Sequence, residues 1–318
     1  MPTRKTPNRV ATLWRPLLLG ACLAATGLVP IQAVAEAPAD APVPPLRMAI
    51  SERVVWGVGV DDARAATAVW TTALLKNINV KMEMAPDQAW VLPSDQLLAA
   101  IRGRKEDLFC ITVQEYRHVT AAVDTSRLIT DNYGGDELLL VVRGESGMAS
   151  LRDLRGRSLL LWESPSTTLA EPWLAVAVGQ EGLGTPRQLL TRVTTNTKLA
   201  QVVLPVFFGQ SDACVVTRRG WDTMVELNPQ LSRKLKVMMA SPPMEGVFFA
   251  CRRDYPARLR NSIFDGLLTL KSSPPARQIL TLFQSPGFTD RNADCLRPAM
   301  VLLDAYERLG APVAVKAK

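Results

Sequence analysis

Short apolar runs alternate with helix-like segments along most of this 318-residue chain. Residues 108–113 and 138–142 are almost wholly apolar, which is typical of strands that are buried on both faces. The segment that begins at Asp61 or Asp62 and reaches Lys76 has apolar residues at helical spacing instead. This alternation predicts an α/β fold with mainly parallel sheets, because parallel strands need a crossover, usually a helix, between them.

The same pattern locates the expected elements. We expect strands at residues 46–50, 80–84, 108–113, 138–142, 159–162, 213–216, 235–239 and 247–250. The C-terminal part is expected to be mostly helical, with helices at residues 257–270, 276–283 and 296–309.

The N-terminus has the three parts of a secretory signal peptide. Four basic residues precede an apolar run at 17–29, and Ala33-Val34-Ala35 supplies a small-residue cleavage site. We therefore expect residues 1–35 to be removed and the mature protein to reach the periplasm. A lipoprotein anchored through Cys22 is the alternative, but little apolar sequence precedes that cysteine. Residues 36–45, rich in Ala and Pro, are expected to form a flexible leader. The roughly 280 residues that follow are enough for two domains or lobes.

The charge balance argues against nucleic-acid binding. The whole chain carries a net charge of +7, and removal of four basic residues with the signal peptide lowers it to +3. Aromatic residues make up only 6% of the chain, and no dense run of Lys and Arg occurs.

Four cysteines remain in the mature chain: Cys110, Cys214, Cys251 and Cys295. No C-x-x-C motif occurs, which argues against zinc binding and thioredoxin-like chemistry. Export permits disulfides, and four cysteines allow three pairings. Free buried thiols are equally compatible with the apolar runs around three of them.

A hydroxyl cluster follows the expected strand at 159–162. Ser166, Thr167 and Thr168 stand just before an expected helix at 169–178, where free backbone N–H groups and the helix dipole favour an anion. Ordinary helix capping is the competing interpretation, because Thr168 and Glu171 have the spacing of a capping box. The sequence leaves both interpretations open.

Other polar clusters stand at equivalent places in the expected fold. They lie at residues 57–62, 114–116 and 217–219, each beside an expected strand or helix start. Open α/β sheets bind ligands at the carboxyl ends of their strands. We therefore expect Asp61, Tyr116, Thr217 and Arg218 to join the three hydroxyl residues in one ligand-binding site.

The chain resembles the periplasmic substrate-binding proteins of ABC importers, in the branch that binds phosphate, phosphite and phosphonate. The blocks that carry this resemblance are residues 57–70, 97–116, 151–168, 204–216 and 241–252. The resemblance implies the type II fold, with two lobes that each contain a mainly parallel sheet flanked by helices. Two crossover strands would join the lobes. Lobe 1 would hold residues 46–142 and 243–318, and lobe 2 would hold residues 143–242.

In phosphonate-binding relatives, a Ser/Thr turn at a helix start holds the anion, and this implies the same role for Ser166, Thr167 and Thr168. A Tyr after a lobe 1 strand corresponds to Tyr116. The chain departs from the family pattern at Leu169, which stands where a glycine is usual.

The implied function is that of a monomeric receptor that captures a small anionic ligand and delivers it to an ABC permease. A ligand-sensing or scaffold partner of a membrane signalling receptor is the alternative, and a binding fold used only for protein contacts is a third reading. We expect no enzyme activity, no cofactor and no metal site. The mature chain has one histidine, His118, and neither a nucleophile elbow, a zinc-protease motif nor a Walker loop.

Overall fold

The computed structural model describes residues 43–55, 59–131, 135–272, 277, 280 and 287–310. The expected signal peptide, Cys22, most of the leader and most of residues 276–283 lie outside this part of the chain, as do Gly57 and Val58. The chain divides into two units, Met1–Pro42 and Val43–Lys318, and the second contains all described residues.

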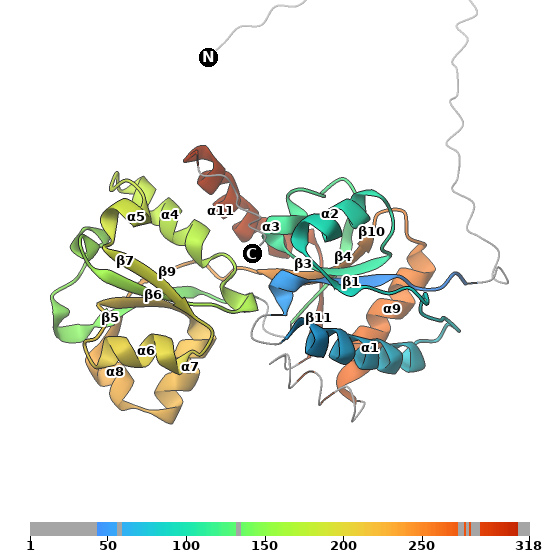
Figure 1. Cartoon of the computed structure of the whole chain (residues 1–318), viewed down its shortest axis with the longest axis horizontal. Helices are drawn as coiled ribbons and strands as arrows, with labels where there is room; N and C mark the ends of the chain where they lie inside the picture. The colour runs from blue at the N-terminus through green and yellow to red at the C-terminus, as the bar shows by residue number, and fades with distance from the viewer. Residues whose placement is uncertain are drawn as a thin grey trace, which may run out of the picture. The chain divides into compact units, whose positions relative to one another are not determined.

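The first of two sheets has the strand order β11-β4-β10-β3-β1-β2 (Figure 1). Its strands are β1 (Met48–Ser51), β2 (Trp90–Leu92), β3 (Leu108–Thr112), β4 (Val123–Asp131), β10 (Val247–Arg252) and β11 (Phe288–Arg291). Helices α1 (Val60–Asn77) and α9 (Ala257–Thr269) pack against one face. Helices α2 (Ser94–Arg102) and α3 (Val113–Tyr116) contribute to the core on the other face.

The second sheet has the order β7-β6-β8-β5-β9. Its strands are β5 (Leu138–Arg143), β6 (Ser158–Trp162), β7 (Arg192–Asn196), β8 (Ala213–Thr217) and β9 (Leu235–Ala240). One face packs against α4 (Ala170–Gln180) and α5 (Pro186–Leu189), and the other against α6 (Ala200–Phe207), α7 (Arg218–Leu227) and α8 (Gln230–Lys234).

Strand β3 shows why these runs become central strands. Its side chains alternate between two apolar clusters: Phe109 and Ile111 belong to one, and Leu108 and Cys110 to the other. A strand buried on both faces needs apolar residues at every position, and this accounts for the unbroken run in the sequence.

The α/β architecture with two sheets is confirmed, but the expectation of mainly parallel sheets is wrong. Antiparallel pairs are β10 with β3 and β4, β11 with β4, and β5 with β8 and β9, whereas four other pairs are parallel. The reason is that a strand arriving from the other sheet is antiparallel to the parallel strands already there. Strand β10 returns to the first sheet in this way, and β5 enters the second. The prediction of a strand at residues 80–84 is also wrong. Within this segment only Met84 forms a β-bridge, an isolated one with Leu46.

The chain passes between the sheets twice, after β4 and after β9. The two connecting segments pair with each other, through Asp136 and Met244. Residues 138–142 were expected to close lobe 1, but β5 is hydrogen-bonded to β8 and β9 in the second sheet. We therefore propose that the first lobe boundary lies between Asp131 and Leu138 rather than after Val142.

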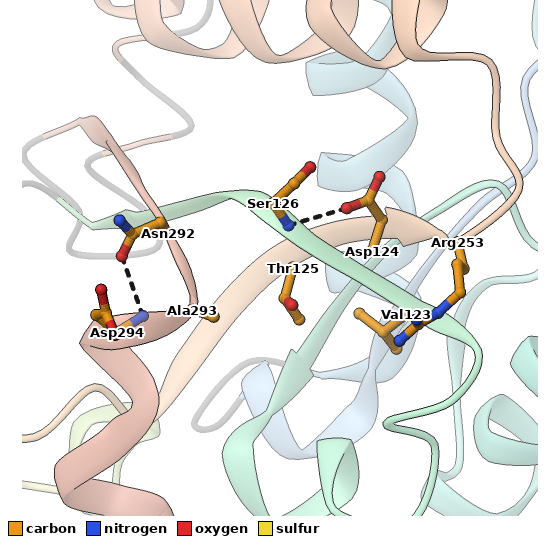
Figure 2. A pocket seen from close by; sticks show the side chains of 8 residues that line it. All are labelled: Val123, Asp124, Thr125, Ser126, Arg253, Asn292, Ala293 and Asp294. Atoms are coloured by element: carbon orange, nitrogen blue, oxygen red, sulfur yellow. Dashed lines mark hydrogen bonds between the residues drawn. The ribbon is translucent and has the colours of Figure 1, made fainter. Parts of the chain in front are cut away.

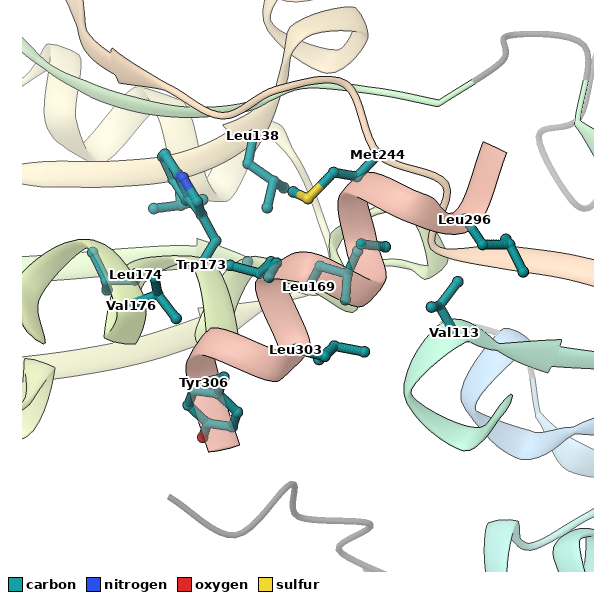
Figure 3. Packing of buried hydrophobic residues seen from close by; sticks show 14 of the residues in the cluster. Val113, Leu138, Leu169, Trp173, Leu174, Val176, Met244, Leu296, Leu303 and Tyr306 are labelled. Carbon is teal, nitrogen blue, oxygen red and sulfur yellow. The ribbon is translucent and has the colours of Figure 1, made fainter. Parts of the chain in front are cut away.

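The C-terminal helix α11 (Arg297–Arg308) lies between helices that belong to different sheets. Figure 3 shows Leu303 and Tyr306 of α11 among buried residues that include Trp173 of α4 and Val113 of α3. The Arg117 guanidinium, which follows α3, pairs with Asp304 and Glu307 of α11. One apolar cluster thus runs from the first sheet to the second by way of α11.

The described residues also include four cysteines and a set of helices whose length and hydropathy can be assessed. Cys110, Cys214, Cys251 and Cys295 are all free thiols in this structure. No described helix is long and apolar enough to cross a membrane.

Candidate ligand-binding cavity

A cavity of about 520 Å³ is lined by both sheets and by both connecting segments. Trp70 and Phe249 come from α1 and from β10 of the first sheet, and Trp162 and Ser166 come from β6 of the second sheet and the turn after it. Asp136 and Glu245 come from the two connecting segments. Its volume lies in the range of small-molecule sites. Ligand pockets also occur preferentially between two domains or lobes of a protein.

A second hollow, of about 540 Å³, lies on the surface beside β4 (Figure 2). Two of its polar side chains are engaged locally: the Asp124 carboxylate accepts from Ser126 N and pairs with Arg260, and the Asn292 side chain accepts from Asp294 N. These two side chains therefore already have protein partners.

The hydroxyl turn is built around a short helix, η4 (Pro165–Thr167), and only part of it faces the cavity. Ser164, Pro165 and Ser166 line the cavity. The Thr167 hydroxyl is used internally, since it donates to Trp162 O at 2.5 Å and accepts from Ser164 N at 3.0 Å. Ser166 is exposed, and its hydroxyl has no hydrogen-bond partner within the described residues.

Thr168 is neither the cap of α4 nor a lining residue. Helix α4 begins after Leu169, which makes no side-chain capping bond. Capping-box geometry forms instead between Ser164 and Thr167. The Thr168 hydroxyl is buried without a hydrogen-bond partner among the described residues. A Cβ on Gly246 would lie 2.9 Å from it, so the turn contacts the returning connection closely.

The start of α7 is already occupied by acidic groups of this protein. The Thr217 hydroxyl lines the cavity but caps α7 by accepting from Gly220 N at 3.1 Å. Arg218 Nε lies 2.9 Å from Glu137 Oε2 and is not a lining residue. Arg219 lines the cavity, and its backbone N–H donates to Asp136 Oδ1. These carboxylates compete with any ligand anion for the positive groups at this helix start.

Tyr116 and Asp61 do not line the cavity. The Tyr116 ring packs edge-on against Phe248, with centroids 5.5 Å apart, so it lies behind a lining residue. Asp61 stands in the first turn of α1, where its carboxylate is 95% exposed and pairs with Arg64. The structure thus brings together Ser166 and Thr217 of the seven expected residues, and places the others in capping, packing or surface positions.

The structure also adds lining residues that the sequence did not single out. Lys198 precedes α6, and no ion pair involves it among the described residues. Asp131, Asp136 and Glu245 contribute three carboxylates. Lys198 follows the strand β7, so a search of polar residues after every strand would have found it, had that strand been recognised.

Glu245 is a buried carboxyl group of the cavity with a strongly raised pKa. It is 5% exposed, and burial together with the nearby Asp131 raises its pKa from 4.5 to about 7. Arg291, Arg219 and a hydrogen bond from the Thr130 side chain oppose this increase. Near neutral pH the side chain therefore changes charge readily.

Comparison with solved structures gives similar folds at low sequence identity. A binding protein component of an ABC phosphonate transporter from Pseudomonas aeruginosa shares 14% identity with a TM-score of 0.54, covering 86% of this chain and 90% of that one. PhnD1 from Prochlorococcus marinus, solved with methylphosphonate, shares 14% identity with a TM-score of 0.55 and covers 84% and 100%. A Xanthomonas citri protein bound to ATP shares 17% identity with a TM-score of 0.57 and covers 83% and 98%. These likenesses establish the fold.

Sequence comparison identifies the family. No curated protein matches the chain. The model of one protein family, described as ABC transporter, phosphonate, periplasmic substrate-binding protein, matches residues 95–294, which is more than half of the chain. The chain therefore belongs to the phosphonate family of periplasmic substrate-binding proteins of ABC transporters.

Proposed function

We propose that this protein is a monomeric periplasmic receptor that holds a small solute with an anionic group and presents it to an ABC permease. The observation that supports this most directly is the cavity lined by both sheets, with two connecting segments at its edge. Two bodies joined in this way close on a ligand by hinge motion, and the ligand stabilises the closed state. Family membership favours delivery to a permease over the role of a sensor partner.

The anionic group would lie beside Ser166 and Lys198. The Ser166 hydroxyl is a donor without a protein partner in the described part of the chain. Lys198 adds a positive charge after β7, the parallel neighbour of the strand that precedes Ser166. Thr217 lines the same wall, although its hydroxyl already caps α7. Export is expected to follow cleavage after Ala35, in keeping with the periplasmic family.

Removal of the proposed anion contacts should weaken binding. In Ser166→Ala and Lys198→Gln, we expect the affinity for methylphosphonate to fall by about 10- to 150-fold each, because hydrogen bonds to charged groups contribute about 1.5–3 kcal/mol. Isothermal titration calorimetry on the mature chain measures this directly.

Arg218→Gln is the matched control. It removes a positive charge that Glu137 neutralises outside the cavity, so the affinity should stay within about twofold of the wild type. A thermal-shift series with phosphate, phosphite, methylphosphonate and alkyl sulfonates covers the anion class, since a ligand that binds the native state raises the melting temperature. The absence of any shift across this series would contradict the proposed function.

A further inference from the structure

One wall of the cavity is aromatic. The rings of Trp70 and Phe249 are stacked, with centroids 5.5 Å apart and an interplanar angle of 24°. Phe288 meets both rings edge-on, at 6.2 Å from Trp70 and 5.5 Å from Phe249. These residues come from α1, β10 and β11, and all three line the cavity. Small phosphonates offer almost no apolar surface to such a wall.

Carboxylates stand at the border of this aromatic wall. Asp131 is paired directly with Phe288 across β4 and β11, so the two side chains leave the sheet on the same face. Glu245 lies close enough to Asp131 for the two charges to interact. Carboxylates therefore adjoin the aromatic rings, and the Arg219 guanidinium lies 3.6 Å from Asp131 Oδ2.

Two carboxylate oxygens of the cavity lack hydrogen bonds. Glu245 Oε1 and Asp136 Oδ2 are buried without a hydrogen-bond partner within the described residues. The Arg219 guanidinium is 3.7 Å from Asp136 Oδ2. Three carboxylates and two cations, Lys198 and Arg219, line the cavity in the described part of the chain. A buried polar atom without a partner is costly, and a ligand that donates to it removes this cost.

We infer that the solute carries an organic ammonium group on an apolar body, with the body against Trp70, Phe249 and Phe288 and the ammonium group donating to Glu245. An ammonium ion provides a donor for the unpartnered oxygen of Glu245, and the faces of aromatic rings attract cations. A metal ion fits less well, because no group of three potential ligand side chains comes together among the described residues. The inference uses the cavity of the proposed function and adds a second recognition element to it.

Matched probes separate this inference from the proposed function. The probes are 2-phenylethylammonium, its neutral analogue 2-phenylethanol, ethylammonium and methylphosphonate, each titrated into the mature chain at pH 7.5. We expect 2-phenylethylammonium to bind about tenfold or more tightly than either 2-phenylethanol or ethylammonium. Trp70 belongs to the aromatic wall, so tryptophan fluorescence should change on binding.

Glu245→Gln is the decisive variant, because it keeps the shape of the side chain and removes its charge. The preference for 2-phenylethylammonium over 2-phenylethanol should fall about tenfold or more. Glu106→Gln, which alters a carboxyl group outside the cavity, should leave both affinities unchanged.

The possible outcomes distinguish the ammonium inference from the proposed function. If methylphosphonate binds and 2-phenylethylammonium binds no better than its alcohol, the inference is wrong and the proposed function stands. If the ammonium probe binds and no anion does, the inference holds and the anionic ligand is wrong. If none of the four probes binds and the wider anion series is also inert, both are overturned.

Discussion

Replacement of Glu115 by Ala is expected to lower the free energy of unfolding by about 3 kcal/mol or more. The Glu115 carboxylate is fully buried, and it accepts hydrogen bonds from Ser51 Oγ at 2.6 Å, from Ser94 Oγ, and from Thr112 N at 2.8 Å and Thr112 Oγ1 at 3.0 Å. Its removal leaves these donors buried without a partner, and each orphaned group costs about 1–3 kcal/mol.

Urea unfolding followed by tryptophan fluorescence measures the effect, with Glu145→Ala as control. Glu145 is 83% exposed and lies 3.7 Å from Arg143, so its loss should change the stability by less than about 0.5 kcal/mol. In Glu115→Gln the amide retains one acceptor oxygen but presents an NH₂ group to surrounding donors, so an intermediate loss is expected. A Glu115→Ala protein as stable as the control would show that this network contributes nothing to the fold.

The position of Glu115 shows where sequence reasoning reaches its limit. Residues 114–116 were interpreted as a polar cluster at a strand end, and a ligand site and a buried network look alike in such a segment. The difference lies in the partners, and Ser51 and Ser94 come from β1 and α2, far away in the chain. Only the bond to Thr112, three residues earlier, could have been recognised, as a capping box.

The buried strands were the predictable part of the fold, because burial on both faces leaves an unbroken apolar run. Strands β3, β5 and β8 are all of this kind. Strand β4 mixes polar and apolar residues, and β7 is an exposed edge strand with the sequence RVTTN. Neither strand therefore appears in the sequence as an unbroken apolar run. Strand direction was not predictable, because it depends on which strands return from the other sheet.

Only those parts of the cavity whose polar groups come from a single continuous segment could be predicted from the sequence. The turn at Ser166 follows a buried strand, and its hydroxyls pointed to a ligand site. Trp70, Phe249 and Phe288 meet from three distant segments, and no local pattern marks them. Arg218 was expected to hold an anion, but Glu137 of the first connection neutralises it, a contact that the sequence could not reveal.

Replacement of Glu245 by Gln is expected to stabilise the ligand-free protein at pH 8 by about 2–3 kcal/mol and to have little effect at pH 5. The pKa of Glu245 is about 7 in the folded protein against an ordinary value of 4.5, chiefly because of burial and then because of Asp131. The folded state therefore binds more protons than the unfolded state between these values, and stability falls as the pH rises from about 4.5 to 7. Gln has no charge to bury, so the variant escapes this loss.

Melting temperatures of wild type and variant at pH 5, 6, 7 and 8 test the sign. Glu106 is the matched control, because burial also raises its pKa to about 7, so Glu106→Gln should show a similar trend. A Glu245→Gln protein less stable than the wild type at pH 8 would mean that the folded protein holds this carboxylate charged and well paired, which contradicts the unpartnered Oε1.

The two variants should then differ only when the ligand is present. An ammonium group that pairs with Glu245 favours the charged carboxylate, so binding of 2-phenylethylammonium to the wild type should strengthen as the pH rises from 5 to 8. The same rise should persist in Glu106→Gln and disappear in Glu245→Gln. Because stability and affinity are expected to change in opposite directions with pH, a general effect of pH on folding cannot produce both results. Both follow if one buried carboxylate is costly when the cavity is empty and is paired when the solute is bound.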